Sequence, residues 1–276
     1  MRKSQEIMKM PTSGRWRAQM RCVVACAFFA ALWPLPACVA DNATAAPSQT
    51  ADADTAEAWL ARIEARAAEL KTLTATLRYD RINTLTGDEQ RRFGKLWYDA
   101  GPPGRFAIHL DKLLVPAGDI WRGEPQNRWY IFDGQWLLER NHDDRVAIRR
   151  QLVTPDELAA GRDPLGLGEG PFPLPLRAKK DAVLARYTVT LVAPAADDPA
   201  GTVHLKLVPH DAAAEVQQLD LWYDRTTLLP VKAVQVAEDE AVITLRDVET
   251  DTDLPPATFD TALPAESGWT VEQGEG

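Results

Sequence analysis

The sequence predicts an α+β fold, in which about eleven antiparallel strands form the main structure and a few helices accompany them. Three observations lead to this prediction. Residues 55–71 carry apolar side chains at helical spacing, whereas two longer regions alternate between apolar and polar side chains with a period of two. Between those regions, residues 154–186 combine a helix-capping motif with a run of prolines and glycines. We expect six strands before this insertion and five after it.

Residues 1–40 are predicted to be a signal peptide. They contain all three cysteines and all four methionines of the chain. Arg15, Arg17 and Arg21 precede an uninterrupted apolar run over residues 22–33, which is too short to span a bilayer and is followed by small residues suited to cleavage. We therefore expect the protein to be exported to the periplasm or the cell envelope.

The end of this leader allows two kinds of processing. The sequence Leu35-Pro36-Ala37-Cys38 resembles a bacterial lipobox, in which the cysteine becomes the lipidated N-terminus, although proline is unusual at its second position. Cleavage after Ala40 or Ala45 fits the small-x-small pattern as well. Cys38 is thus either a lipid anchor or a small apolar residue of a discarded leader. Residues 41–54 form a predicted flexible lead-in.

The charge of the mature chain excludes one class of partner. The whole chain has a net charge of −9, and removing residues 1–40, with six Lys/Arg and one Glu, leaves 25 basic and 39 acidic residues, a net charge of −14. Nucleic acids and anionic membranes bind proteins through cationic surfaces that displace counterions. We therefore expect no nucleic-acid partner.

One amphipathic helix is predicted at residues 55–71. Asp54 is the expected N-cap, with Glu57 three residues later as in a capping box. The apolar residues at helical spacing are Trp59, Ile63, Ala67 and Leu70. This stripe must pack against another element.

The period then changes to two, and the clearest hairpin follows a predicted connection at residues 119–127. Asp133-Gly134 favours a two-residue type I′ turn, so that Phe132 would face Gln135 and Ile131 would face Trp136. One face of the hairpin would carry Trp129, Ile131, Trp136 and Leu138, and the other Tyr130, Phe132 and Leu137. Since both faces are apolar, we expect protein or ligand to cover each side of the sheet.

The insertion begins with a short helix. Thr154-Pro155-Asp156-Glu157 is a capping box with proline at the first helical position, and Gly161 ends the helix. Residues 163–176 hold four prolines and three glycines, yet they also hold Leu and Phe, so this segment must pack against the body of the protein. A second short helix is expected at residues 179–186. Five strands follow, at residues 187–192, 202–208, 216–223, 231–236 and 241–248.

The sequence gives no catalytic, cofactor or metal site. The mature region has no cysteine, and its two serines, Ser48 and Ser267, lie in the lead-in and the tail. The four histidines are scattered, and His142-Asp143-Asp144 is more typical of a solvated turn than of a metal site. A pair of carboxylates acting as a glycosidase acid and base stays open, because the acidic residues are numerous and none is singled out.

The order of elements resembles the LolA/LolB family of bacterial lipoprotein carriers over residues 55–271. The local matches are residues 94–97 (Gly-Lys-Leu-Trp) followed by Phe106, then Asp133-Gly134, then residues 207–209 (Leu-Val-Pro), and a closing pattern of Phe259 and Pro264. The resemblance implies a single domain that is an unclosed half-barrel of about eleven strands, with a helical lid over an apolar cavity. The proline-rich residues 163–176 depart from the family pattern.

What the resemblance implies about function is a non-enzymatic carrier or acceptor that shields the acyl chains of lipoproteins or lipids, with membrane proteins as further partners. The residues expected to line the cavity are Trp59, Ile63, Trp97, Phe106, Ile108, Trp129, Ile131, Trp136 and Leu138. Plain core packing is the alternative role for the large aromatic residues. The alternative functions are an envelope sensor that binds a protein partner and an uncharacterised hydrolase of envelope polymers.

Overall fold

A single twelve-stranded sheet is the framework of the protein in the computed structural model, which describes residues 54–167, 172–265 and 268–275. The spatial order of the strands is β12-β6-β5-β4-β3-β2-β1-β11-β10-β9-β8-β7. Their bounds are β1 Thr72–Asn83, β2 Glu89–Asp99, β3 Arg105–Ala117, β4 Ile120–Phe132, β5 Trp136–Asn141, β6 Val146–Gln151, β7 Tyr187–Val192, β8 Thr202–Pro209, β9 Gln218–Asp224, β10 Pro230–Val236, β11 Asp239–Thr250 and β12 Thr270–Glu275.

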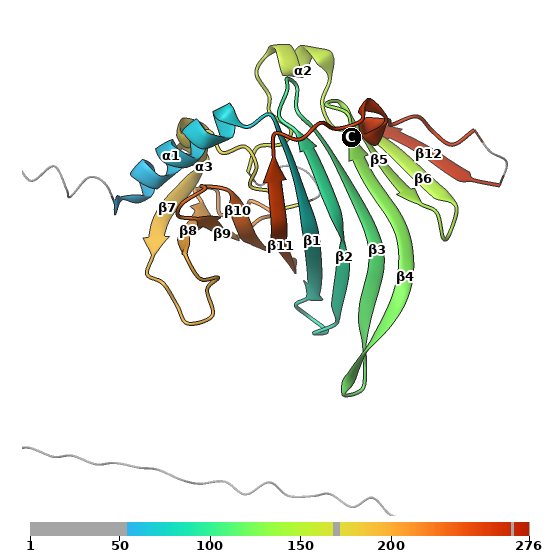
Figure 1. Cartoon of the computed structure of the whole chain (residues 1–276), viewed down its shortest axis with the longest axis horizontal. Coiled ribbons are helices and arrows are strands. Elements are labelled where there is room, and N and C mark those ends of the chain that lie inside the picture. The colour runs from blue at the N-terminus through green and yellow to red at the C-terminus, as the bar shows by residue number, and fades with distance from the viewer. Residues whose placement is uncertain (1–53, 168–171, 266–267, 276) are drawn as a thin grey trace, which may run out of the picture. The chain divides into compact units, whose positions relative to one another are not determined.

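The sheet is open and almost wholly antiparallel. Its two edge strands are β7 and β12, and among the strands of the described residues only β12 and β6 pair in parallel. Figure 1 shows the long strands β1 to β4 curving together through the middle of the sheet. The predicted class, an open antiparallel α+β fold, is therefore confirmed, with twelve strands in place of about eleven. The added strand is β12, whose polar sequence shows no apolar alternation.

The helices of the described residues that accompany the sheet are α1 Ala56–Glu69, α2 Pro155–Ala159, α3 Lys180–Arg186 and the 3-10 helix η2 Pro256–Phe259. The N-cap of α1 is Thr55, whose hydroxyl accepts from the Ala58 amide at 3.1 Å, so the prediction of Asp54 as the cap was wrong. Asp54 instead accepts a hydrogen bond from the Trp59 indole at 3.0 Å. The capping box of α2 and the end of this helix before Gly161 are as predicted, and Gly161 has a φ of +90°.

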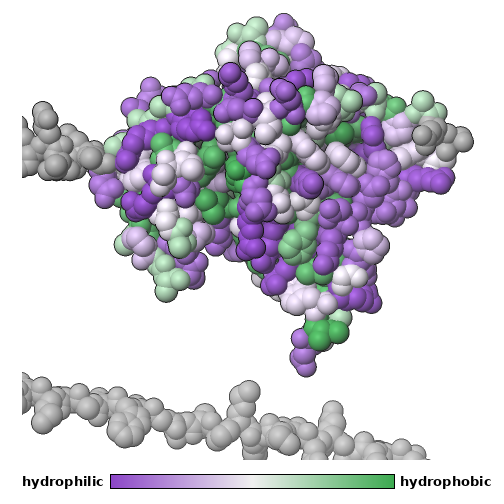
Figure 2. Space-filling view, in the orientation of Figure 1, coloured by the Kyte–Doolittle hydropathy of each residue, from purple (hydrophilic) through white to green (hydrophobic). Residues whose placement is uncertain are grey.

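The connection predicted at residues 119–127 is wrong, because residues 120–127 belong to β4. Strands β3 and β4 form one long hairpin that turns at Gly118, where φ is +65°. The strand register breaks between Leu110 and Lys112, and Pro125 pairs with Lys112 at this break. At the tip of this hairpin Ile120 and Trp121 are exposed, and Figure 2 shows a hydrophobic spot there.

The β4–β5 hairpin differs from its predicted register by two residues. Phe132 pairs with Leu137 and Ile131 with Leu138, because the turn is centred on Gly134 and Gln135, with the Asp133 amide donating to the Trp136 carbonyl. A shift of two residues keeps every side chain on its face, since the period of a strand is two. The two apolar faces predicted for this hairpin are therefore present.

Each face of the sheet is covered by a segment without regular strands. We call the inner face the one covered by α1, α3 and an inner cover, residues 163–167 and 172–178. Its core includes Leu77, Leu96 and Phe106, and continues toward β8 and β9 through Leu205 and Leu221. The outer face is covered over β2 to β6 by an outer cover, residues 254–265 with Trp269, which packs on Ala107, Ile131, Leu138 and Ala147.

The described residues form part of a single compact unit. None of their helices is both long enough and apolar enough to span a bilayer. The predicted signal peptide, the lead-in as far as residue 53 and the candidate lipidation residue Cys38 lie outside the described residues, so the predictions about them stay predictions.

Candidate functional site

The inner cover places one aromatic ring in the middle of the inner face. Phe172 is 6% exposed, and its ring centroid lies 4.8 Å from that of Tyr130, 5.3 Å from that of Tyr79 and 6.4 Å from that of Phe106. All three contacts are edge-to-face, the geometry that aromatic quadrupoles favour. The three partners come from β1, β3 and β4, where the period of two points them to the same side. Phe172 therefore fills the hollow of the curved sheet.

Polar contacts hold the inner cover on either side of this ring. The Tyr187 hydroxyl donates to the Leu167 carbonyl at 3.3 Å, and the Tyr223 hydroxyl donates to the Pro175 carbonyl at 3.0 Å. Arg177 donates to the Pro103 carbonyl at 2.9 Å and lies 3.4 Å from the Asp163 carboxylate. Among the described residues of the inner cover, the only sheet-like pairing is an isolated bridge within the cover itself, between Gly166 and Arg177. The cover is thus held by polar contacts on either side of Phe172, and Leu174 and Leu176 pack in the same core as that ring.

An arginine cluster, Arg81, Arg92 and Arg128, continues the inner face beyond this ring. Arg81 follows Tyr79 by two residues on β1, and Arg92 pairs directly with Tyr79 from β2. Arg128 precedes Tyr130 by two residues on β4. The alternation of each strand therefore places these guanidinium groups on the same face as the aromatic rings.

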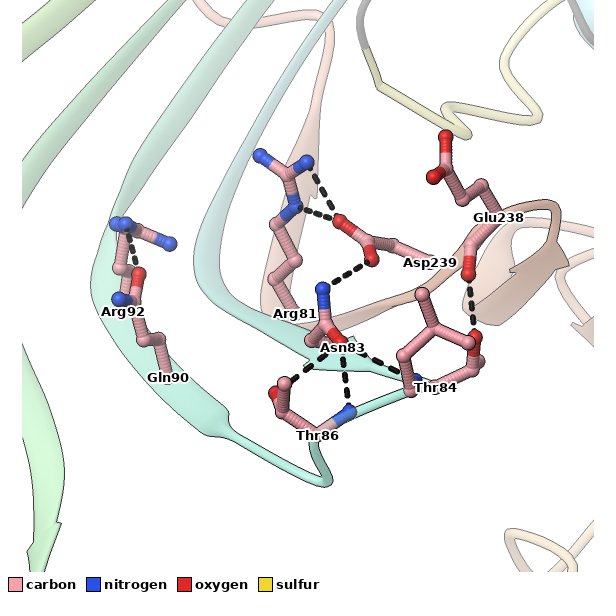
Figure 3. Close-up of polar contacts among 9 residues, drawn as sticks. Arg81, Asn83, Thr84, Thr86, Gln90, Arg92, Glu238 and Asp239 are labelled. Atoms are coloured by element: carbon pink, nitrogen blue, oxygen red, sulfur yellow. Dashed lines mark hydrogen bonds and ion pairs between the residues drawn. The ribbon is translucent and has the colours of Figure 1, made fainter.

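The three arginines differ in how they are paired. Arg81 binds Asp239, its Nε donating to Oδ2 at 2.8 Å, and Asn83 donates to the same carboxylate at 3.1 Å (Figure 3). In the described part of the chain, the only hydrogen bond of the Arg92 side chain is the one it donates to the Gln90 amide oxygen (Figure 3). Arg128 lies 3.9 Å from Glu139, which also lies 3.7 Å from Arg150. The Nε atoms of Arg92 and Arg128 are buried without a hydrogen-bond partner in the described structure.

Burial sets the electrostatics of this region. Desolvation lowers the pKa of Arg92, and the neighbouring Arg128 and Arg81 lower it further, while Tyr130 and Tyr79 oppose them. Burial is also the main reason that the pKa values of Tyr79 and Tyr130 are raised. An arginine stays protonated despite such a shift. Arg92 is therefore a half-buried cation that no carboxylate neutralises among the described residues.

The nine residues predicted to line one cavity are divided between the two faces. Phe106 and Ile108 lie in the inner-face core beside Phe172, and Trp59 and Ile63 lie further along that face, where α1 packs on the second group of strands. The five on the outer side are Trp97, Trp129, Ile131, Leu138 and Trp136. The sheet separates the two groups, so one cavity cannot be lined by both.

The outer group has partners of its own. The ring of Trp129 stacks on two neighbours. Its centroid lies 5.7 Å from that of Trp97 and 4.2 Å from that of His109. The Arg149 guanidinium lies 4.2 Å from the centre of the Trp136 ring. Ile131 and Leu138 pack under Phe259 of the outer cover. Trp97, Trp129, Ile131 and Leu138 thus pack between the sheet and the outer cover.

Sequence reasoning missed the arginine cluster, although a signal for it exists. Arg92 stands in the same alternating series as Leu96 and Tyr98, and Arg128 in the same series as Tyr130 and Phe132. A charged residue that prolongs a buried apolar stripe is informative, because burial of an ion without compensation is costly. The described residues contain no group of three or more His, Cys, Asp or Glu side chains arranged for a metal ion.

Comparison with known proteins gives matches only among solved structures. No protein-family model and no curated protein matches the chain. An uncharacterized conserved protein from Thermus thermophilus has 10% identity and a TM-score of 0.44, with 78% of this chain and 98% of that chain covered. The complex of Pseudomonas aeruginosa MucA and MucB has 16% identity and a TM-score of 0.38, with 75% and 61% covered. A LolA superfamily protein from Nitrosomonas europaea has 14% identity and a TM-score of 0.33, with 73% and 97% covered.

Proposed function

We propose that this chain binds acyl chains of lipids or lipoproteins on the inner face of its sheet, as a carrier or acceptor in the cell envelope that performs no catalysis. The binding region is the part of the inner face now filled by Phe172, with Tyr79, Phe106 and Tyr130 around it and Ile108 beneath. The observation that carries the proposal is the way in which this apolar face is covered. An irregular segment, held by hydrogen bonds on either side of Phe172, inserts that ring there.

Exchange of that ring for an acyl chain has a small net cost. Apolar surface gains about 25 cal/mol per Å² when it leaves water, whether it belongs to a phenyl ring or to a hydrocarbon chain. A ligand that displaces Phe172 therefore restores the lost contacts, and each further buried methylene adds about 0.8 kcal/mol. By contrast, displacing a strand would break a ladder of backbone hydrogen bonds.

A cleft supports access to this face. It lies between the end of α1 and the inner cover and is lined by Leu70, Tyr98 and Ala178 among others. Leu70 and Tyr98 also belong to the inner-face core that contains Phe106. An acyl chain entering here would reach the core without opening the sheet.

The direct test is organic extraction of the purified mature protein followed by lipid mass spectrometry, together with titration of a fluorescent fatty acid. A carrier should retain acyl lipid and should bind the probe. Retention of little lipid and absence of probe binding would favour the protein-binding sensor instead. Turnover of an envelope polymer by a protein without lipid would favour the hydrolase.

A matched pair of variants locates the binding region. Phe172→Ala and Phe259→Ala each remove one buried phenyl ring from a cover, the first from the inner and the second from the outer face. We expect Phe172→Ala to change the affinity for the fatty-acid probe several-fold and Phe259→Ala to leave it unchanged in the folded fraction. Equal effects of the two variants would mean that the probe enters any cavity, and would remove the support for an inner-face site.

A further inference from the structure

The arginine cluster on the inner face is a concentration of positive charge in an otherwise acidic protein, whose net charge is −9. On each of β1, β2 and β4 the stripe of buried side chains ends at an arginine, and the three stripes end near one another. The three guanidinium groups are close enough to interact electrostatically. Both Arg81 and Arg128 lower the pKa of Arg92. Only Arg81 has a carboxylate, Asp239, within ordinary hydrogen-bond distance.

Such a cluster opposes folding unless something compensates it. Like charges repel one another, and the half-buried Arg92 and Arg128 have each given up water at Nε without gaining a partner among the described residues. Protein sites that are unfavourable for stability in this way are typical of binding sites, where a ligand supplies the missing partner. An anion placed between Arg92 and Arg128 would relieve both the repulsion and the lost hydrogen bonds.

We infer that Arg92 and Arg128 bind the anionic head group, a carboxylate or a phosphate, of an amphiphile whose acyl chain lies among the inner-face aromatic residues. This inference rests on the proposed function and names its substrate class. The geometry joins the two parts, because Arg92 pairs across the strands with Tyr79, and Arg128 lies two residues from Tyr130 on the same face. Both tyrosines contact Phe172, so the head-group site adjoins the ring that the chain would replace.

Arg92 and Arg128 are better suited to this role than the third arginine. Arg81 is occupied by Asp239, which Asn83 also holds in place. The nearest carboxylate to Arg128, Glu139, lies at 3.9 Å, is shared with Arg150 and accepts from the Tyr130 hydroxyl at 3.2 Å. Arg92 has only a neutral amide as its partner. Two guanidinium groups thus keep donors for a ligand oxygen.

The experiment compares three probes by isothermal titration calorimetry: palmitate, hexadecanol and inorganic phosphate. Palmitate and hexadecanol share a chain and differ in head-group charge, whereas phosphate has the charge without a chain. The variants are Arg92→Gln and Arg128→Gln, with Arg246→Gln as the control, since Arg246 is an exposed arginine on the outer face of β11. Melting temperatures of the ligand-free proteins are measured in parallel.

We expect the native protein to bind palmitate at least tenfold more tightly than hexadecanol, and to lose that preference as salt is raised. Arg92→Gln and Arg128→Gln should each weaken palmitate binding about tenfold or more, leave hexadecanol binding unchanged and keep or raise the melting temperature. Arg246→Gln should change none of these values.

Four results would overturn the inference, and they separate it from the proposed function. Equal affinity for palmitate and hexadecanol would exclude head-group recognition while leaving acyl-chain binding intact. Binding of neither chain would remove the proposed function itself. Phosphate binding as tight as palmitate binding would assign the cluster to a free anion, and a lower melting temperature with unchanged palmitate affinity would assign the arginines to folding alone.

Discussion

The two covers of the sheet make an informative comparison, because both lack long regular elements and both bury a phenylalanine, yet they are attached in different ways. The outer cover contains a 3-10 helix, continues into β12, which pairs with β6, and reaches the β4–β5 turn through Thr261 and Asp133. The inner cover is fastened by tyrosine hydroxyls and Arg177 at its ends and inserts Phe172 between them. The outer cover is therefore continuous with a strand of the sheet, whereas the inner cover is held by side-chain contacts on either side of Phe172.

The faces also differ in the chemistry of their aromatic residues. All five tyrosines of the chain, Tyr79, Tyr98, Tyr130, Tyr187 and Tyr223, lie on the inner face. The stacked pair Trp97 and Trp129 lies on the outer face, with an indole donating to Asn127. Phenols can ionise and can hold a backbone carbonyl or a ligand oxygen, whereas tryptophan offers a larger apolar surface with one donor. The inner face thus carries polar atoms within an apolar setting, as binding sites do.

The largest expected effect is that of removing the outer cover. A chain that ends at Asp253 would expose the apolar groups of the outer face, among them Ile131, Leu138 and Ala147. Loss of Phe259 alone should lower the free energy of unfolding by about 3 to 5 kcal/mol. We expect the truncated chain to lose its cooperative thermal transition, measured by circular dichroism. A chain that lacks only residues 270–276 is the control and should keep that transition; cooperative melting of the shorter chain would contradict the role given to the outer cover.

High pH should destabilise the protein through the inner face. Burial raises the pKa of Tyr98 to about 12 and also raises that of Tyr223. In the unfolded chain a tyrosine loses its proton near pH 10, so between about pH 10 and 12 the folded state binds more protons and stability falls as pH rises. For Tyr98 alone the fall approaches about 2.7 kcal/mol above pH 12, where the group is ionised in both states.

Urea unfolding between pH 8 and pH 12 measures this effect, and Tyr98→Phe tests its source. The variant should match the native protein at pH 8, because no hydrogen bond of the Tyr98 hydroxyl is present in the described structure, and it should lose less stability above pH 10. An identical pH profile for the two proteins would mean that Tyr98 ionises as readily when folded as when unfolded.

The framework could be predicted from sequence because it depends on periodicity. The period of two places apolar side chains on one or both faces, and even the register error at the β4–β5 hairpin preserved the face of each residue, since it amounted to two positions. The two covers could not be predicted in the same way. Phe172 and Phe259 belong to segments without a period, so only tertiary contacts determine which face each one covers. The cavity residues were therefore gathered from both faces, and the arginines on the true inner stripes were passed over.

A matched pair of hydrogen bonds tests the attachment of the covers at a smaller scale. Thr261 is buried and donates to the Asp133 carboxylate, whereas the Tyr223 hydroxyl donates to the Pro175 carbonyl at 3.0 Å. Thr261→Val and Tyr223→Phe should each cost about 1 to 3 kcal/mol of stability, because each leaves an acceptor unsatisfied. Only Tyr223→Phe should alter binding of the fatty-acid probe, since it loosens the inner cover. A change in probe binding with Thr261→Val would show that the outer cover also reaches the site.

The smallest expected effect on binding belongs to Trp136, which was predicted to line the cavity and lies on the outer side. Its neighbour Leu137 points inward and packs in the core that contains Phe172. Trp136→Ala should leave the affinity for the fatty-acid probe within about twofold, because the ring contacts Arg149 and not the inner face.

Leu137→Ala should lower the free energy of unfolding by about 2 to 5 kcal/mol and change probe affinity in the folded fraction. Fluorescence titration of both variants, normalised to the folded fraction, compares adjacent residues on opposite faces. Tenfold weaker binding by Trp136→Ala, with Leu137→Ala unchanged, would move the acyl site to the outer face and reverse the roles assigned to the two covers.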